Sequence, residues 1–104
     1  MRYDTPIYFQ QILPGEYDPE TGNYQEDRVT EEQRMAAVMD TNTETMQLVY
    51  GKIRQGSLTI HLQNRYIKPY DRIRIGSRLY TVSLKRDLRV KQTMILTEVQ
   101  NAQN

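Results

Sequence analysis

The chain has no cysteine and no tryptophan among its 104 residues, and it has only one histidine. Without cysteine, neither a disulfide nor a thiolate metal site holds the fold together. Long apolar runs are also missing. The longest, Met35 to Met39, is far too short to cross a bilayer, and the N-terminus lacks the apolar segment of a signal peptide. We therefore expect a protein of a reducing compartment that makes no membrane contact.

Large aliphatic and phenylalanine side chains are scarce as well. Leu, Ile, Val and Phe account for 23 residues, or 22% of the chain, barely above the level of about 20% below which disorder is expected. A chain of this length forms one domain, residues 1–104, and buries only roughly 65% of its unfolded surface. The predicted core is thin, so we expect association with itself or with a partner to bury further apolar area.

The net charge of +1 conceals a strong polarity along the chain. Residues 1–50 hold three basic and ten acidic side chains, whereas residues 65–91 hold nine basic and two acidic side chains. Three interpretations stand side by side. The two halves neutralise each other within one fold, or the acidic part of one subunit meets the basic part of the next in a ring, or the basic half binds nucleic acid.

No set of residues suits catalysis, a cofactor or a metal ion. Ser57 and His61 fall on one predicted strand about 13 Å apart, beyond hydrogen-bond reach. The adjacent Glu31 and Glu32 lie in a polar connection where nothing is expected to raise a carboxyl pKa. We expect a protein that is not an enzyme, with His61 in a structural or solvated role.

Three segments of the first half are assigned from composition. Ile7 to Leu13 is a short strand candidate bounded by Pro6 and Pro14, and residues 14–32 form a long, flexible hairpin loop with turn residues at its centre. Residues 33–40, "QRMAAVMD", would suit a helix by propensity, but we assign a strand because the clear helix signal comes just after it.

That helix is predicted over residues 42–50. Thr41 and Glu44 have the spacing of a capping box, and Met46, Val49, Tyr50 and Ile53 recur at helical spacing. Gly51 suits the left-handed position that ends a helix. Because such a helix is too short to be stable alone, it must dock on the rest of the protein.

After Gly56 the apolar period changes to two. Leu58, Ile60 and Leu62 share one strand face, which turns His61 away from the core. A two-residue turn of type II′ at Gly76-Ser77 then pairs Ile75 with Arg78 and Ile73 with Tyr80. This register predicts an inner face and a basic outer face that carries Arg72 and Arg74. The inner face consists of Ile73, Ile75, Tyr80, Val82 and Leu84.

A charged connection, "KRDLRVK", leads to a last strand that is apolar on both faces, with Met94 and Leu96 on one and Ile95 and Val99 on the other. We expect residues 101–104 to form a frayed tail. The predicted fold is therefore mainly β: a small antiparallel β-barrel of five to six strands with one short helix.

Basic residues interleaved with tyrosines on a small barrel are typical of proteins that bind single-stranded nucleic acid. The candidates are Arg65, Tyr66, Lys68, Tyr70, Arg72 and Arg74. Against this interpretation, Tyr80 falls on the inner face and the overall charge is close to neutral. Tyrosines that fill half-buried positions in a protein without tryptophan are the simpler explanation.

The order of these segments resembles a known family. The stretches "TPIYFQ", "GEYDPETGNY", "TETMQLVYGKI", "LTIHLQNRYIKPYDRIRIGSRLYTV" and "KQTMILTEVQ" are similar, in this order, to the small head-tail joining proteins of tailed bacteriophages. The similarity is greatest to the head-closure, or stopper, proteins of long-tailed phages and prophages. It extends over roughly residues 5–100, with "LQNRYIKPYDRIRIGSRLYTV" and "MQLVYGKIRQG" as its most specific parts.

The resemblance implies a virion protein at the head-tail interface, present in the host cytoplasm during assembly. It would form a homo-oligomeric ring below the portal and adaptor, pass DNA through its channel without reading the sequence, and offer a docking surface for tail or tail-completion proteins. A tail-side completion protein and a small nucleic-acid-binding barrel remain alternatives.

Two sets of residues follow as candidates. The basic contacts, to a neighbouring subunit or to DNA in the channel, are Arg65, Lys68, Arg72, Arg74 and Arg78. The segment that closes the channel is expected around the helix, residues 40–56, with the loop of residues 16–32 as the alternative. Within the first segment the candidates are Thr43, Glu44, Gln47, Lys52 and Arg54.

Overall fold

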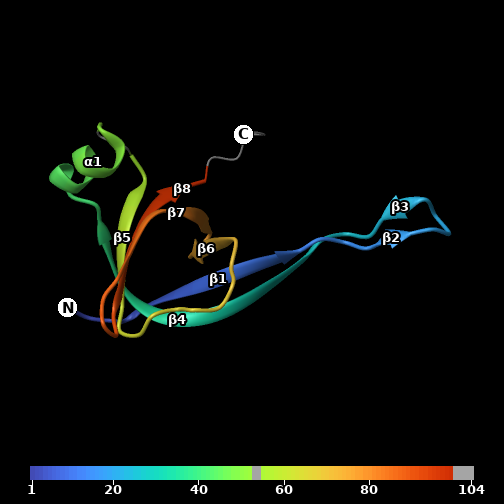
Figure 1. Ribbon diagram of the computed structural model, residues 1–104, viewed down its shortest axis with the longest axis horizontal. Helices are drawn as coiled ribbons and strands as arrows, with labels where there is room; N and C mark the ends of the chain where they lie inside the picture. Colours follow the sequence, from blue (N-terminus) through green and yellow to red (C-terminus); the bar gives the residue numbers. More distant parts are fainter. Residues whose placement is uncertain (53–54, 100–104) are drawn as a thin grey trace.

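The computed structural model describes residues 1–52 and 55–99, which form a closed antiparallel β-barrel with one helix and one projecting hairpin (Figure 1). Around the barrel the order is β1-β4-β5-β8-β7-β6. The bounds are β1 (Thr5–Leu13), β4 (Arg28–Asp40), β5 (Ser57–Leu62), β6 (Arg72–Ile75), β7 (Arg78–Asp87) and β8 (Gln92–Glu98). The predicted fold class is confirmed, and residues 33–40 are indeed strand.

Strand β1 closes the barrel because it pairs with β4 along one edge and with β6 along the other. The pair Phe9 and Ile73 lies at this closure, and both side chains are buried. The ring of Phe9 stacks on that of Tyr66, with centroids 3.7 Å apart and planes 3° from parallel. Every barrel strand is thus paired on both sides, which removes the exposed edges of a small open sheet.

The core is formed by side chains that alternate along the strands, as the period of two predicts. Ile60 and Leu62 of β5 point inward and Thr59 and His61 point outward. The ten core residues are Ile7, Phe9, Ala36, Ile60, Leu62, Tyr66, Ile73, Tyr80, Met94 and Leu96. At roughly 1.5–3 kcal/mol for each large side chain, their burial is the main stabilising contribution to the fold.

The segment predicted as a flexible loop, residues 14–32, is mostly a defined hairpin. Strand β4 begins at Arg28, so residues 28–32 belong to the barrel wall, and Arg28 pairs with Leu13. Beyond them the ribbon of β2 (Tyr17–Asp18) and β3 (Asn23–Tyr24) forms a second, two-stranded sheet. The prediction of a long hairpin connection is confirmed, but its length was overestimated because the alternation of charged and apolar residues in β4 is weak.

A close backbone approach defines the base of this hairpin. A Cβ atom on Gly15 would lie 1.7 Å from the carbonyl oxygen of Gln25, so only glycine fits there. The Gly15 amide donates to Asp27 Oδ1 at 2.9 Å, and the Gln25 amide donates to the Glu16 carbonyl at 2.8 Å. We refer to residues 14–27 as the arm.

The hairpin of β6 and β7 has the predicted register, with Ile75 opposite Arg78 and Ile73 opposite Tyr80. Gly76 has φ of 61°, as the first central residue of a type II′ turn requires. Among the described residues, only glycines have positive φ. One predicted position is wrong. A β-bulge between Val82 and Leu84 shifts the alternation, so Leu84 faces outward opposite Ile95 and is 50% exposed.

The same strand continues further than expected. Residues 85–87 of the predicted connection "KRDLRVK" belong to β7, and the turn to β8 is confined to residues 88–91, where the Leu88 amide donates to the Lys91 carbonyl. Strand β8 is buried on both faces, as predicted, for Met94, Ile95 and Leu96. Val99 lies after the strand and is partly exposed.

Helix α1 (Thr43–Tyr50) agrees with the predicted range, but its first residue is capped differently. Asn42 Oδ1 accepts a hydrogen bond from the Thr45 amide at 2.7 Å, in place of the predicted capping box of Thr41 and Glu44. Thr41 is instead buried, and its hydroxyl is hydrogen-bonded to Ser57 and Thr59 of β5. Gly51 ends the helix in the left-handed conformation with φ of 72°, as predicted.

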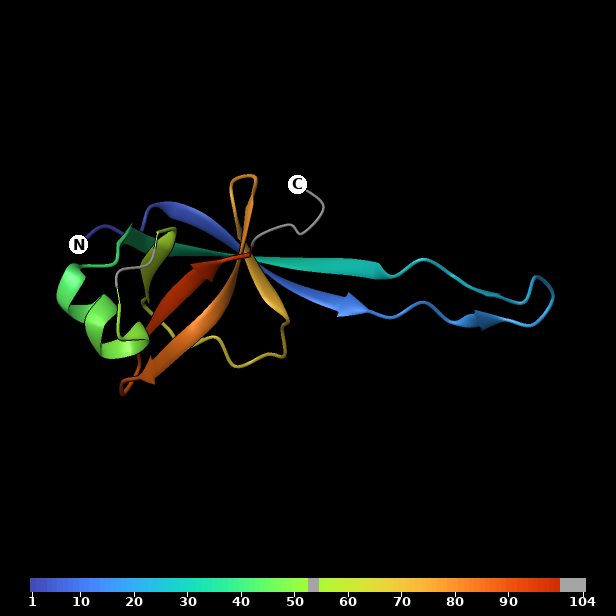
Figure 2. The same ribbon diagram turned by 90° about the horizontal axis from the view of Figure 1, so that it is seen from above.

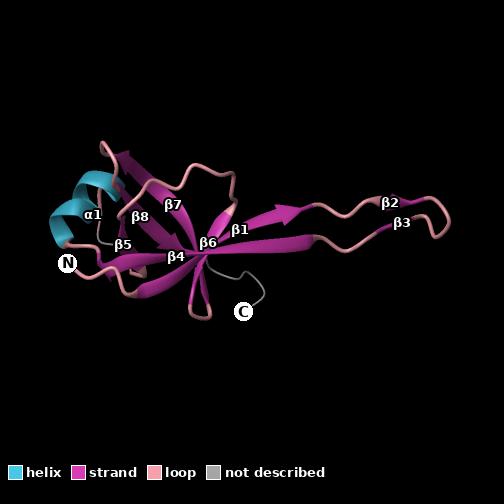
Figure 3. Cartoon of the chain, turned by 90° about the horizontal axis from the view of Figure 1, so that it is seen from below, coloured by secondary structure: helices cyan, strands magenta, loops and turns pink. Residues whose placement is uncertain are grey.

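The arm makes the molecule elongated. Its extents are 54 × 30 × 21 Å and its radius of gyration is 16.1 Å, whereas a compact domain of this length is expected near 13 Å. The helix lies at one end of the long axis and the arm projects from the other (Figure 2). The view from below shows the same separation (Figure 3).

Candidate interaction surfaces

The predicted basic residues lie on the outer wall, but most of them contact partners within the chain. Arg74 Nε donates to Glu31 Oε2 at 2.7 Å, and Lys68 Nζ donates to Glu32 Oε2 at 2.9 Å. Arg72 Nε donates to Gln10 Oε1. This side of the barrel therefore agrees with local neutralisation of the two halves, one of the three interpretations of the charge polarity.

The two remaining predicted basic residues are more exposed. Arg78 lies 3.5 Å from Glu98 with its side chain 66% exposed, a weak ion pair. Arg65 makes no ion pair with another described residue, and its backbone amide donates to the Val90 carbonyl. Of the five candidates, only Arg65 keeps a charge without a partner in the described part of the chain.

These ion pairs shift the ionisation of the glutamates. The hydrogen bond from Arg74, followed by that from Gln10, lowers the pKa of Glu31 below its ordinary value. The hydrogen bond from Lys68 has the same effect on the pKa of Glu32. Arg74 also lies over the ring of Tyr8, with its guanidinium carbon 4.0 Å from the ring centroid. The ring and Glu31 hold Arg74 against the barrel, so it is poorly placed to reach a phosphate.

The two tyrosines proposed to stack on bases are part of the core region. Tyr66 is 7% exposed and lies flat against Phe9, while Tyr70 packs edge-on against both rings. Burial raises the pKa of Tyr66 and of Tyr70. The interpretation of these residues as half-buried filler is correct, and their faces are not available to a nucleic acid.

The predicted channel-closing residues around the helix are exposed. Thr43, Glu44, Gln47 and Lys52 are all on the surface, and Arg54 lies outside the described residues, as does Ile53. No residue of α1 is buried. The helix is held to the barrel by the hydroxyl of Tyr50, which is within hydrogen-bond distance of Ser57, Ser83 and Thr97.

His61 lies on the outer face, as predicted, in a hollow of about 340 Å³ that we call the outer hollow. Its Nδ1 is 3.0 Å from the hydroxyl of Thr93, and burial lowers its pKa. The outer hollow is lined by Met39, Asp40, Asn42, Thr45, Thr59, His61, Leu84, Arg86, Thr93 and Ile95. Three apolar side chains, several hydroxyls and one arginine suit an amphipathic occupant better than a charged one.

Sequence reasoning missed a second basic surface next to this hollow. Arg86, Arg89 and Lys91 lie around the turn between β7 and β8, and Arg65 joins them through its backbone hydrogen bond to Val90. None of the four side chains forms an ion pair within the described chain. We call these four residues the basic corner. The many charged residues in "KRDLRVK" could have indicated this surface from the sequence. The proximity of Arg65 could not be predicted, because it depends on the fold of the turn between β7 and β8.

Across residues 1–52 and 55–99, no group of His, Asp and Glu side chains could hold a metal ion, and no helix is long and apolar enough to cross a membrane. Comparisons with protein-family models, curated proteins and solved structures found no match to this chain.

Proposed function

We propose that the protein is a head-closure subunit of a tailed-phage connector, which forms a ring below the portal and adaptor, retains packaged DNA and offers a surface to the tail. The observation that carries this proposal is the arm. Residues 19–31 are all exposed, and an isolated two-stranded hairpin is marginally stable in water. A thin-cored barrel that maintains such an arm is suited to assembly, where a neighbouring surface covers it.

The helix segment supports the proposal in a second way. None of the residues of α1 is fully buried, so its displacement exposes less apolar surface than the loss of a barrel strand would. Segments with little buried surface are the ones that can change position when a ring assembles. We propose that the described part of this segment before residue 53, residues 40–52, faces the channel and that its exposed polar side chains, including Glu44 and Gln47, contribute to channel closure.

The proposal is tested by mixing the purified protein with DNA-filled, tailless heads and imaging the portal vertex. We expect an additional ring of density and improved retention of DNA. If no ring appears and the heads keep their DNA equally well without the protein, the head-closure proposal is wrong. A ring that forms only on isolated tails would favour the tail-side completion role.

A second candidate function, nucleic-acid binding, is favoured by the basic corner, which includes Arg65 but none of the other residues first predicted. Its charges are unpaired in the described chain, whereas Lys68 and Arg74 are occupied by Glu32 and Glu31. A direct binder would hold short DNA with an affinity that falls steeply with salt, and Arg86→Ala would reduce that slope. Arg74→Ala is the matched control and is expected to leave the slope unchanged.

A further inference from the structure

The arm is strongly acidic. Residues 14–27 contain five carboxylates and no basic side chain. None of the five forms an ion pair with a described residue. Two tyrosines, Tyr17 and Tyr24, lie among them with ring centroids 5.3 Å apart, and they are 54% and 76% exposed. The arm therefore presents an aromatic pair surrounded by negative charge.

The basic corner presents the complementary chemistry. Leu88 and Val90, which are partly exposed, lie in the same turn as Arg89 and Lys91. Arg86 also lines the outer hollow, whose exposed apolar side chains are Met39 and Leu84. A tyrosine has an apolar body and a polar tip, and an arginine attracts the face of its ring. The outer hollow, with apolar walls and the hydroxyls of Thr59 and Thr93, suits that side chain.

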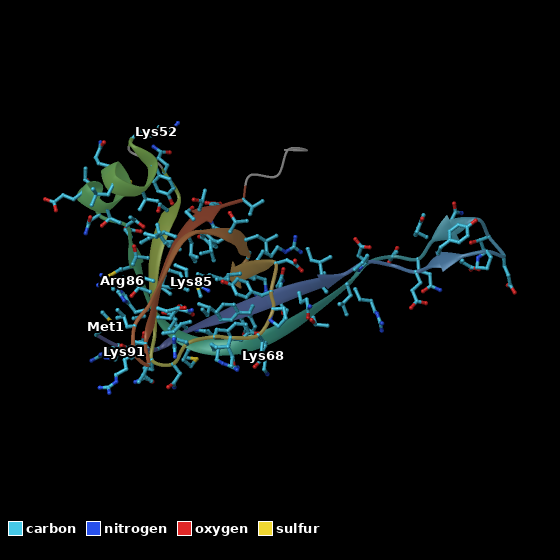
Figure 4. The ribbon with its side chains drawn as sticks, in the orientation of Figure 1. Met1, Lys52, Lys68, Lys85, Arg86 and Lys91 are labelled. Carbon is cyan, nitrogen blue, oxygen red and sulfur yellow. The ribbon has the colours of Figure 1, made fainter. Side chains whose placement is uncertain are left out.

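The two surfaces cannot meet within one molecule. Arg86 and Lys91 lie at the end of the long axis opposite the arm (Figure 4), and the longest extent is 54 Å. The β1–β4 ladder is paired without a break up to the arm, so the arm cannot fold back over the barrel. Contact between the two surfaces requires a second copy of the chain.

We propose that the arm of one copy binds the basic corner and the outer hollow of the next copy. The carboxylates of the arm face Arg65, Arg86, Arg89 and Lys91, and Tyr24 occupies the hollow beside Arg86. The contact joins two different surfaces, so each copy offers one free arm and one free corner. Repetition gives a closed ring if the rotation between copies closes.

In the proposed ring, this contact would join neighbouring subunits. Only the closure of the contacts into a ring rests on the proposed function. The pairing itself depends on charges and apolar groups present on the isolated chain. It is therefore tested with purified protein, apart from any phage particle.

The chain has no cysteine, which makes disulfide trapping selective. Asn23→Cys places a thiol next to Tyr24, and Leu84→Cys places one at the rim of the outer hollow. When the two variants are mixed under mild oxidation, we expect the mixed disulfide to form at least several-fold faster than in the control mixture. The control pairs Asn23→Cys with Ile67→Cys, because Ile67 is 89% exposed and lies outside the basic corner.

Charge variants test the electrostatic part. Arg86→Glu with Arg89→Glu, made on the Leu84→Cys chain, should reduce the trapping rate to that of the control mixture. The opposite reversal, Glu16→Lys with Glu20→Lys, is made on the Asn23→Cys chain. When this chain is mixed with the chain that carries Arg86→Glu and Arg89→Glu, the fast trapping rate should return. Trapping between the original charges should also fall several-fold in 1 M salt, where the screening length is about 3 Å.

Three results would overturn the proposal: equal trapping at Leu84 and Ile67, no effect of the corner reversal, or no rescue by the reversed arm. If the trapping rates at Leu84 and Ile67 are equal but the basic corner binds short DNA, the basic corner is a nucleic-acid-binding surface. If trapping is unselective and a ring still appears on heads, the ring assembles through another contact. Selective trapping without head closure would leave this contact standing and remove the proposed function.

Discussion

The barrel and the arm grow from the same two strands, β1 and β4, yet their chemistry differs completely. In the barrel, Ile7 and Phe9 of β1 are buried in a core to which all five other barrel strands contribute side chains. A few residues further on, Leu13 and Val29 at the base of the arm are 36% and 46% exposed. Backbone pairing of β1 with β4 is unbroken up to Leu13 and Arg28, and strands pair again in the arm between β2 and β3. The comparison shows that hydrogen-bonded strands alone do not make a core, and that the buried apolar side chains that stabilise the fold lie in the barrel and not in the arm.

The largest expected effect comes from the barrel core. Phe9→Ala removes the ring that stacks on Tyr66 at the closure of the barrel, and we expect a loss of about 3–5 kcal/mol in the free energy of unfolding, measured in urea. Leu13→Ala, in the same strand, is the control and should cost less than about 0.5 kcal/mol. If Phe9→Ala does not fold, Ile60→Val gives a graded version, expected to cost about 0.5–1.5 kcal/mol. Equal losses at Phe9 and Leu13 would contradict the comparison.

The next effect is at the junction of the helix and the barrel. Tyr50→Phe removes the hydroxyl that reaches Thr97 at 2.9 Å and Ser57 at 3.2 Å. We expect a loss of about 1 kcal/mol in the free energy of unfolding, together with faster amide exchange in α1. Tyr17→Phe in the arm is the matched control, and its hydroxyl makes no hydrogen bond with the described residues. An unchanged exchange rate in α1 would show that the hydroxyl contacts do not hold the helix.

Much of the barrel was predictable because its residues follow local rules. The alternation in Leu58, Ile60 and Leu62 and the glycine turn at Gly76 fixed the inner face and the register. Leu84 was predicted on the wrong face because a bulge inserts one residue without any local sequence signal. Asn42 was missed as the cap because Thr41 matches the capping-box pattern equally well, and only burial against β5 decides between them.

The candidate surfaces were less predictable because they depend on contacts between distant segments. Arg74 and Glu31 are far apart in the sequence, and only closure of the barrel through β1 makes them partners. The same closure brings Tyr66 onto Phe9 and removes it from the surface. Charge counts by half of the chain described the polarity correctly but could not assign which basic residues keep a free charge.

A smaller effect is expected from the ion pair of Glu31 and Arg74, which is specific to the barrel wall. Because the folded state lowers the pKa of Glu31, its stabilising contribution is complete above the ordinary value of 4.5 and is lost as the pH falls below it. The difference in unfolding free energy between the original chain and Glu31→Gln should therefore be constant near neutral pH and shrink in acid. Glu26→Gln, in the arm, is the control, because Glu26 forms no ion pair with a described residue. A difference that grows as the pH falls would contradict the assignment.

The smallest loss of stability is expected from removing the arm. Because Leu13 and Arg28 are paired, replacing residues 14–27 with Asn-Gly joins β1 and β4 by a two-residue hairpin turn. The barrel should keep its free energy of unfolding or gain slightly, since each halving of loop length saves about 0.6 kcal/mol of closure entropy. The same variant lacks the side chains that would contact the basic corner of the next copy, so it should form no ring on heads if the proposed function holds. A barrel destabilised by this replacement would mean that the arm folds as part of the core, and the separation of roles between the two regions would be wrong.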